Sequence, residues 1–168
     1  MTVNDMKRAL EALGQRLETQ GIQADIVIAG GAWMALVLGS RQVTKDIDAY
    51  IAPPSEPVHR AAKWVAENLG LPSDWLNDGI KGFFYGTVPH ELFLSYGGLR
   101  LYAVAPDYML ALKVFAARDV DCPDVQALVR HLQIGSLSRV LEIVEQYIPS
   151  ELLTAKHQYF AESCLEGS

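Results

Sequence analysis

Apolar residues in the first twenty positions recur at intervals of three and four, which is the spacing of one face of a helix. These apolar positions are Met6, Leu10, Leu13 and Leu17. Charged residues fall between them, and Gly21 follows the last of them. The pattern predicts an amphipathic helix over about residues 3–20 that covers one side of a sheet.

Two short segments predict strands of that sheet. Residues 24–29 form a run that is apolar on both faces after Asp25, as expected of a central strand. In residues 46–51, apolar and polar side chains alternate, which indicates a strand with one buried face. Between the two strands, the segment after Gly31 is apolar nearly all round, and it predicts a short buried helix that ends at Gly39.

The middle of the chain predicts one more helix and further strands. The helix should span residues 56–69, with Gly70 at its end, and a loop should follow over residues 71–82. The expected strands are residues 83–88, 91–96 and 99–104, of which the last two should form a hairpin at Gly97-Gly98.

The remainder of the chain is predicted to be helical. The expected helices are residues 107–118, starting after Pro106, then 123–132, 136–147 with Ser136 as its N-cap, and 149–164. The whole pattern indicates an α/β (α+β) fold: a mixed sheet flanked by helices over residues 1–105, with a C-terminal helical extension over residues 106–168 packed on the same domain.

Composition and charge narrow the function classes. The chain has 168 residues, half of them hydrophobic, which suffices for one buried core. Its net charge of -6 argues against a surface built wholly to bind nucleic acid. Cys122 and Cys164 are far apart without zinc-like spacing, so we expect neither a disulfide framework nor a zinc knuckle. No signal peptide or membrane span is expected, and we expect a cytoplasmic protein.

Two aspartates and two glycines carry the candidate chemistry. Asp46 and Asp48 should share one face of a strand, roughly 6.5 Å apart. Carboxylates in this arrangement can hold hard divalent cations such as Mg²⁺ or Mn²⁺, as phosphoryl and nucleotidyl transfer require, although a solvated strand edge is the simpler alternative. Gly30 and Gly31 stand where strand becomes helix, so the backbone can approach a ligand closely beside a helix N-terminus that favours anions.

The order of these motifs resembles a known group of enzymes. The motifs are a strand ending in Gly30-Gly31, a helix with Gly39 at its end, Arg41 and Thr44, and then Asp46-Ile47-Asp48 on the next strand. This order is similar to that of the DNA polymerase beta-like nucleotidyltransferase superfamily, and most of all to its small bacterial AbiEii-like branch. The resemblance implies that Gly30, Gly31, Arg41 and Thr44 bind the nucleotide and that Asp46 and Asp48 are catalytic metal ligands.

In that superfamily a third carboxylate on a later strand usually completes the metal site. Glu91 is the acidic residue at the start of an expected strand, and the resemblance makes it the candidate third ligand. The alternative is that Glu91 is a solvent-facing charge at the sheet edge.

A second block of residues also resembles the family. It runs from Leu112 to Val125, and its polar members are Lys113, Arg118, Asp121 and Asp124. By position, Lys113 would be the catalytic lysine that contacts nucleotide phosphate, with Arg118 and Asp124 among the nucleotide-binding residues. Lysine in so apolar a setting is uncommon unless it is paired. For Asp121 and Asp124 the alternative is capping of the helix that Pro123 opens.

These observations favour a metal-dependent nucleotidyltransferase that moves a nucleoside monophosphate from a nucleoside triphosphate to a hydroxyl group. The resemblance allows tRNA, a protein or a small molecule as the acceptor, and a role as the toxin of a toxin-antitoxin pair with a cognate antitoxin. The alternative is a catalytically degenerate protein of the same fold that serves as a binding or antitoxin-type partner. A phosphatase explains the motifs less well, because the Gly-Gly turn precedes the aspartate strand.

Overall fold

The computed structural model describes residues 1–84 and 86–167, and Tyr85, inside the strand expected at residues 83–88, lies outside the described residues. The chain forms two compact units. Unit 1 comprises Met1–Gly82 and His90–Ala103, and unit 2 comprises Phe83–Pro89 and the chain from Val104 onward. The expected fold class is confirmed, because the structure combines a mixed sheet with helices in an α+β arrangement.

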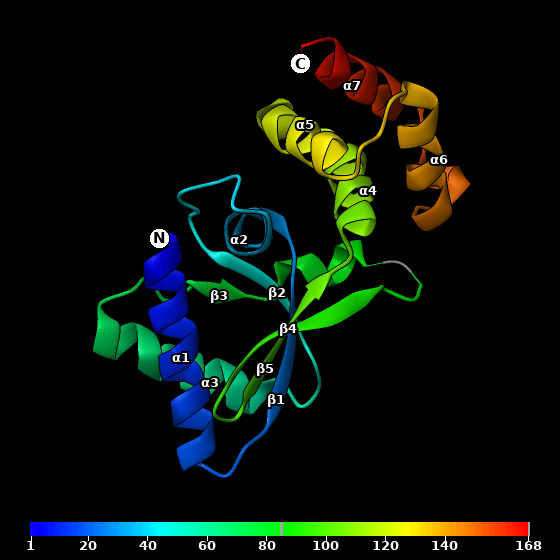
Figure 1. Ribbon diagram of the computed structural model, residues 1–168. Coiled ribbons are helices and arrows are strands. Elements are labelled where there is room, and N and C mark those ends of the chain that lie inside the picture. Colours follow the sequence, from blue (N-terminus) through cyan, green and yellow to red (C-terminus); the bar gives the residue numbers. More distant parts are fainter. Residues whose placement is uncertain (85, 168) are drawn as a thin grey trace. The chain divides into compact units, whose positions relative to one another are not determined.

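The sheet has five strands in the order β3-β2-β1-β5-β4 (Figure 1). The strands are β1 (Ala24–Ile28), β2 (Ile47–Ile51), β3 (Leu76–Asn77), β4 (His90–Tyr96) and β5 (Leu99–Val104). The central strand β1 pairs antiparallel with β2 and parallel with β5, while β2 pairs parallel with β3. The central position predicted for the strand at residues 24–29 is therefore confirmed.

One face of this sheet belongs to the core of unit 1. Ile26 lies opposite Ile51 on β2 and Leu101 on β5, and all three side chains are buried. Helices α1 (Val3–Thr19) and α3 (Glu56–Leu69) contact each other and bury their apolar faces in the same core. The predicted amphipathic helix at the N-terminus is thus present with its expected buried positions.

The segment between β1 and β2 follows its prediction closely. Helix α2 (Gly30–Trp33) continues as a π-helical turn, η1 (Met34–Leu38), and ends at Gly39, whose φ of 71° is left-handed. Helix α3 likewise ends at Gly70, with a φ of 66°. Both predicted C-caps are confirmed, because glycine adopts this conformation without a side-chain clash.

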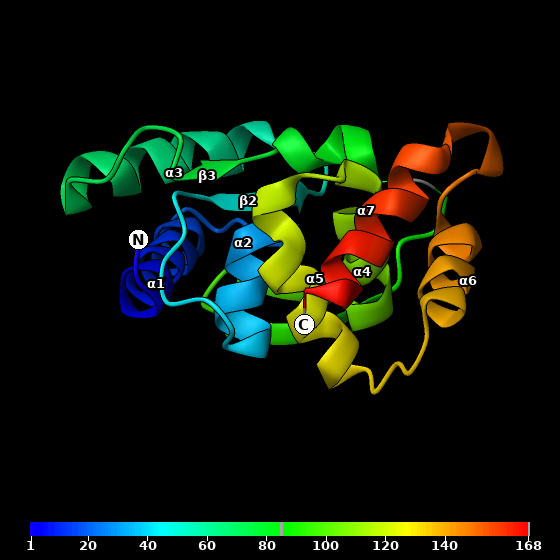
Figure 2. The same cartoon turned by 90° about the horizontal axis from the view of Figure 1, so that it is seen from above.

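Unit 2 is built from helices around α4 (Pro106–Ala116), which contacts α5 (Cys122–His131), α6 (Leu137–Tyr147) and α7 (Ala155–Glu166) (Figures 1 and 2). The predicted cap at Ser136 is confirmed, since its hydroxyl accepts a hydrogen bond from the Arg139 amide. Tyr147 of α6 donates a hydrogen bond of 2.7 Å to Asp107 of α4.

Three predicted boundaries are wrong. The loop expected over residues 71–82 contains the short strand β3 and part of the 3₁₀ turn η2 (Gly79–Phe83), and the described part of residues 83–88 contains no strand. The last helix starts at Ala155 and not at Pro149, because a 3₁₀ turn, η4 (Ser150–Leu152), comes first. Thr154 then forms a reciprocal cap with His157, which starts α7.

The expectation about the cysteines is also wrong. Cys122 at the start of α5 and Cys164 near the end of α7 form a disulfide, with their Cα atoms 5.1 Å apart. The contact between α5 and α7 brings together two residues that are 42 positions apart in sequence. Among residues 1–84 and 86–167, no helix combines the length and apolar character that a membrane span requires.

Candidate functional site

The turn at Gly30 brings the end of β1 against the aspartate strand. Gly30 has a φ of 68°, which favours glycine. A Cβ built on Gly30 would come 3.1 Å from Asp48 Oδ2, so the carboxylate lies directly against this turn. The amide of Ala29 also donates a hydrogen bond of 3.2 Å to the carbonyl of Asp48. Antiparallel pairing of β1 with β2 places these residues at the same end of the sheet.

Gly31 is close to two other side chains of the predicted site. A Cβ at Gly31 would come 2.7 Å from Thr44 Oγ1 and 3.1 Å from Arg41 Nη1. Only a residue without a side chain fits between them. The structure therefore brings Gly30, Gly31, Arg41, Thr44 and Asp48 together in unit 1, as their order in the sequence predicts.

The loop that carries Arg41 and Thr44 is held from both sides. The Thr44 amide donates a hydrogen bond of 3.0 Å to the Met1 carbonyl, and Thr2 forms a β-bridge with Val43. The Thr44 hydroxyl donates to the Asp46 carbonyl over 3.2 Å. Thr44 thus fixes the approach of the chain to Asp46, and its hydroxyl remains beside Gly31.

The two aspartates differ in their backbone position. Asp48 lies in β2, whereas Asp46 lies in the bend just before it, so the prediction that both belong to the strand is wrong for Asp46. Both side chains are half-buried. Burial and then the negative charge of Asp48 raise the pKa of the Asp46 carboxyl, against weaker opposing effects of Lys45 and Asn77. The two carboxylates are therefore close enough to repel each other.

Asn77 is a site residue that the sequence analysis missed. It lies on β3, which pairs with β2 so that Asn77 stands opposite Asp48. Its side chain is hydrogen-bonded to Asp46, and its own Oδ1 accepts a hydrogen bond of 3.1 Å from the Gly79 amide. Asn77 thereby orients the Asp46 carboxylate. The only local signal was the sequence Asn77-Asp78-Gly79, which indicated a turn but no partner.

The donor set fits one hard cation better than two. In the described parts of the chain, no cluster of three or more His, Cys, Asp or Glu side chains is placed to hold a metal. Glu91 lies at the start of β4, and β1 and β5 separate it from β2. Three strand spacings amount to about 14 Å. Asp46 and Asp48 alone suit Mg²⁺, which proteins often bind through one or two carboxylates together with substrate phosphates.

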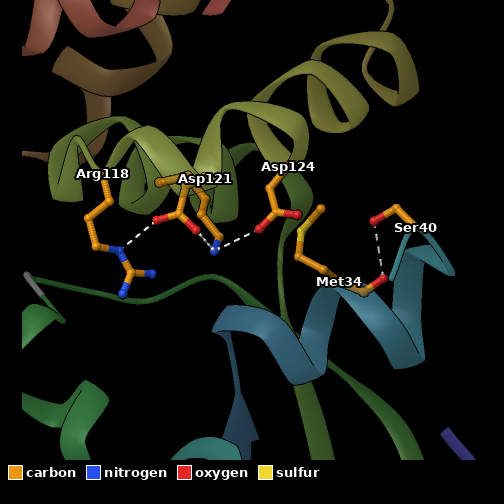
Figure 3. A network of polar contacts seen from close by, with 6 residues as sticks. Met34, Ser40, Arg118, Asp121 and Asp124 are labelled. Carbon is orange, nitrogen blue, oxygen red and sulfur yellow. Dashed lines mark hydrogen bonds and ion pairs between the residues drawn. The ribbon is translucent and has the colours of Figure 1, made fainter. Parts of the chain in front are cut away.

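The second predicted cluster lies in unit 2 and forms a buried ion-pair network. Lys113 of α4 is only 3% exposed, and its Nζ lies 2.8 Å from Asp121 Oδ1 and 2.9 Å from Asp124 Oδ2. Figure 3 shows the network, in which Arg118 Nε also lies 2.7 Å from Asp121 Oδ2. Burial alone would raise the pKa of Asp121, but hydrogen bonds from Lys113 and Arg118 lower it overall.

This network accounts for the lysine in an apolar setting. Asp121 makes no capping hydrogen bond to α5, so the capping alternative does not describe its side chain. Two lysine and arginine cations balance two carboxylates, which joins α4 to the start of α5. The contacts of Lys113, Arg118 and Asp124 with a nucleotide stay a prediction.

Comparison with known proteins adds no relative. No known family matches the sequence, and no curated protein or solved structure is significantly similar to it. The functional interpretation therefore depends on the residues of unit 1 and their geometry.

Proposed function

We propose that this protein is a nucleotidyltransferase that transfers a nucleoside monophosphate from a nucleoside triphosphate to a hydroxyl group. One observation carries the proposal: the Asp48 carboxylate lies against Gly30 while Arg41 and Thr44 lie against Gly31. Carboxylates for a cation, a guanidinium for a phosphate and an open backbone turn converge there. A structural turn alone needs the glycine but does not require this set of side chains around it.

The chain's own groups have distinct roles in this proposal. The Gly30-Gly31 backbone lets the triphosphate approach closely, because neither residue has a side chain to exclude it. The planar guanidinium of Arg41 binds phosphate oxygens through paired hydrogen bonds. Thr44 keeps the loop in place through its bonds to Met1 and Asp46.

Asp46 and Asp48 would hold Mg²⁺ or Mn²⁺, which neutralises charge on the triphosphate when bound. Asp46 is also the better proton acceptor, because its pKa is raised towards the working pH. The acceptor hydroxyl oxygen bonds to the α-phosphorus, pyrophosphate leaves, and the hydroxyl proton passes to the Asp46 carboxylate.

The acceptor and partners are proposed from the resemblance to the AbiEii-like branch. They are tRNA, a protein or a small hydroxylated molecule as the acceptor, and a cognate antitoxin if the protein is a toxin. A cytoplasmic site of action goes with this proposal, because nucleoside triphosphates are its substrates.

A second candidate is a protein of this type that binds nucleotide without turnover and acts as an antitoxin-type partner. The lack of a third acidic ligand near Asp46 and Asp48, among the described residues, favours it. Glu91 is too far across the sheet to supply that ligand.

The test is transfer of α-³²P from labelled nucleoside triphosphates, with Mg²⁺ or Mn²⁺, to total tRNA, to the protein itself and to a panel of aminoglycosides and lincosamides. Label transferred by the native protein and lost in Asp46→Asn/Asp48→Asn supports the enzyme and identifies the acceptor class. Metal-dependent nucleotide binding without any transfer supports the binding partner.

A further inference from the structure

The sheet face that carries Asp48 also carries a row of ring side chains. Tyr50 on β2 lies opposite Val27 on β1, and Val27 lies beside Tyr102 on β5. The ring of His90 on β4 packs edge-on against Tyr102, with ring centroids 5.4 Å apart. Neighbouring positions in register point to the same face, so the row crosses four strands of unit 1.

This face is opposite to the buried one. The residues that alternate with the row, Ile26, Ile28, Leu101 and Ala49, are buried in the core. Tyr50 and Tyr102 are half-buried, His90 is exposed, and Leu92 on the same edge strand is 57% exposed. The next row along the face contains the Asp25–Arg100 ion pair, with Nε to Oδ1 at 2.6 Å.

Packing between the rings does not account for the whole row. Val27 separates Tyr50 from Tyr102 by two strand spacings, or about 10 Å, so these two rings do not form an aromatic pair. Exposed sheet faces with aromatic rings on separate strands can take splayed bases of a single-stranded nucleic acid. Tyr50 is two residues from Asp48 on the same strand, so the row continues into the candidate nucleotide site.

We propose that this face binds single-stranded nucleic acid, with bases stacked on Tyr50, Tyr102 and His90 and one strand end reaching Asp48. The part of this inference that makes the strand the acceptor rests on the proposed function, whereas binding itself does not.

The charge of the face also shapes the proposal. Arg100 is paired with Asp25, and the chain has a net charge of -6. Stacking must therefore supply most of the affinity, and few phosphate contacts should form. Two neutralised phosphates on a single strand give a log-log salt slope of only about -1.4.

The test is the fluorescence anisotropy of end-labelled single-stranded oligouridylate and oligodeoxythymidylate, each about 12 nucleotides long. Binding is measured with chelator and without nucleoside triphosphate. Tyr102→Ala and Tyr50→Ala should each weaken binding by about fivefold or more, and Tyr102→Phe should retain it. Tyr102→Val keeps the strand preference of a β-branched residue without the ring, so it separates loss of stacking from loss of folding. The two oligonucleotides distinguish RNA from DNA as the strand bound.

The matched control is Tyr159→Ala, a tyrosine on α7 of unit 2 that is 68% exposed. Binding that survives in folded Tyr50→Ala and Tyr102→Val, or that falls equally in Tyr159→Ala, overturns the inference. No binding to the native protein overturns it too and indicates another class of occupant for this face. Label transfer to a small molecule together with no oligonucleotide binding would reject only this inference and leave the proposed function standing.

Discussion

The carboxylate of Asp48 lies against Gly30, so closely that a Cβ on this glycine would come 3.1 Å from Oδ2. Pairing of β1 with β2 brings the two residues to the same end of the sheet, and the left-handed φ of Gly30 brings the turn under the carboxylate. The Gly-Gly turn and the aspartate motif are therefore parts of one site.

Gly30→Ala should weaken binding of Mg²⁺ with a nucleoside triphosphate by tenfold or more on the order of one kcal/mol or somewhat above. The new methyl group would push Asp48 Oδ2 and fill the turn. The variant should also lose about 1–2 kcal/mol of stability because of its left-handed backbone. Thermal unfolding and calorimetric titration measure the two effects separately.

Gly39→Ala is the matched control, because Gly39 has a similar φ of 71° with no other atom within 4 Å of its built Cβ. It should lose similar stability and keep the nucleotide affinity. Equal affinity losses in both variants would show that backbone strain, and not contact with Asp48, causes the effect.

Asp48→Asn should lower the pKa of Asp46, because it removes a neighbouring negative charge. A raised pKa means that the folded protein holds this proton more tightly than the unfolded chain. The stability contributed by Asp46 is thus present below about 3.8 and is lost as the pH rises through the raised folded value. Carboxyl carbon NMR titration measures the pKa, with the exposed Asp119→Asn as control. An unchanged Asp46 pKa in Asp48→Asn would contradict the close placement of the two groups.

Lys113→Met should destabilise the protein by about 3–5 kcal/mol, because it leaves two buried carboxylates without their cation. The pKa of Asp121 is lowered in the folded state, so its stabilising effect is present above 3.8 and is lost as the pH falls through the folded value. Denaturant unfolding at several pH values should show less acid sensitivity of this kind in Lys113→Met. Lys156→Met, at an exposed lysine, should change little. A stable Lys113→Met that has lost nucleotide binding would instead support contact of Lys113 with phosphate.

Local signals made much of the fold predictable. The ends of helices at Gly39 and Gly70 and the start at Ser136 depend on residues within one turn, so their chemistry is visible in the sequence. The meeting of Gly30 with Asp48 was also predictable, because consecutive strands of a sheet commonly pair.

What depends on distant packing was not predictable. Asn77 contacts Asp46 only because the two-residue strand β3 pairs with β2, and so short a strand leaves no periodic pattern. Cys122 meets Cys164 only because α5 packs against α7. Sequence spacing contains no information on either approach.

Reduction of the Cys122–Cys164 disulfide should lower the free energy of unfolding by about 3–4 kcal/mol, the value expected for a closed loop of this length. Denaturant unfolding with and without dithiothreitol measures the difference, and Cys122→Ser/Cys164→Ser should be insensitive to the reductant. Two free thiols in the folded protein isolated without reductant, counted by alkylation and mass spectrometry, would contradict the crosslink.

Calorimetric titration of the protein with a non-hydrolysable nucleoside triphosphate, with Mg²⁺ and then with chelator, tests the proposed site without knowledge of the acceptor. We expect saturable one-to-one binding that requires the cation, is lost in Asp46→Asn/Asp48→Asn and is kept in Asp119→Asn. Absence of binding to the native protein, or binding that the double variant retains in full, would contradict a nucleotide site at Gly30, Asp46 and Asp48.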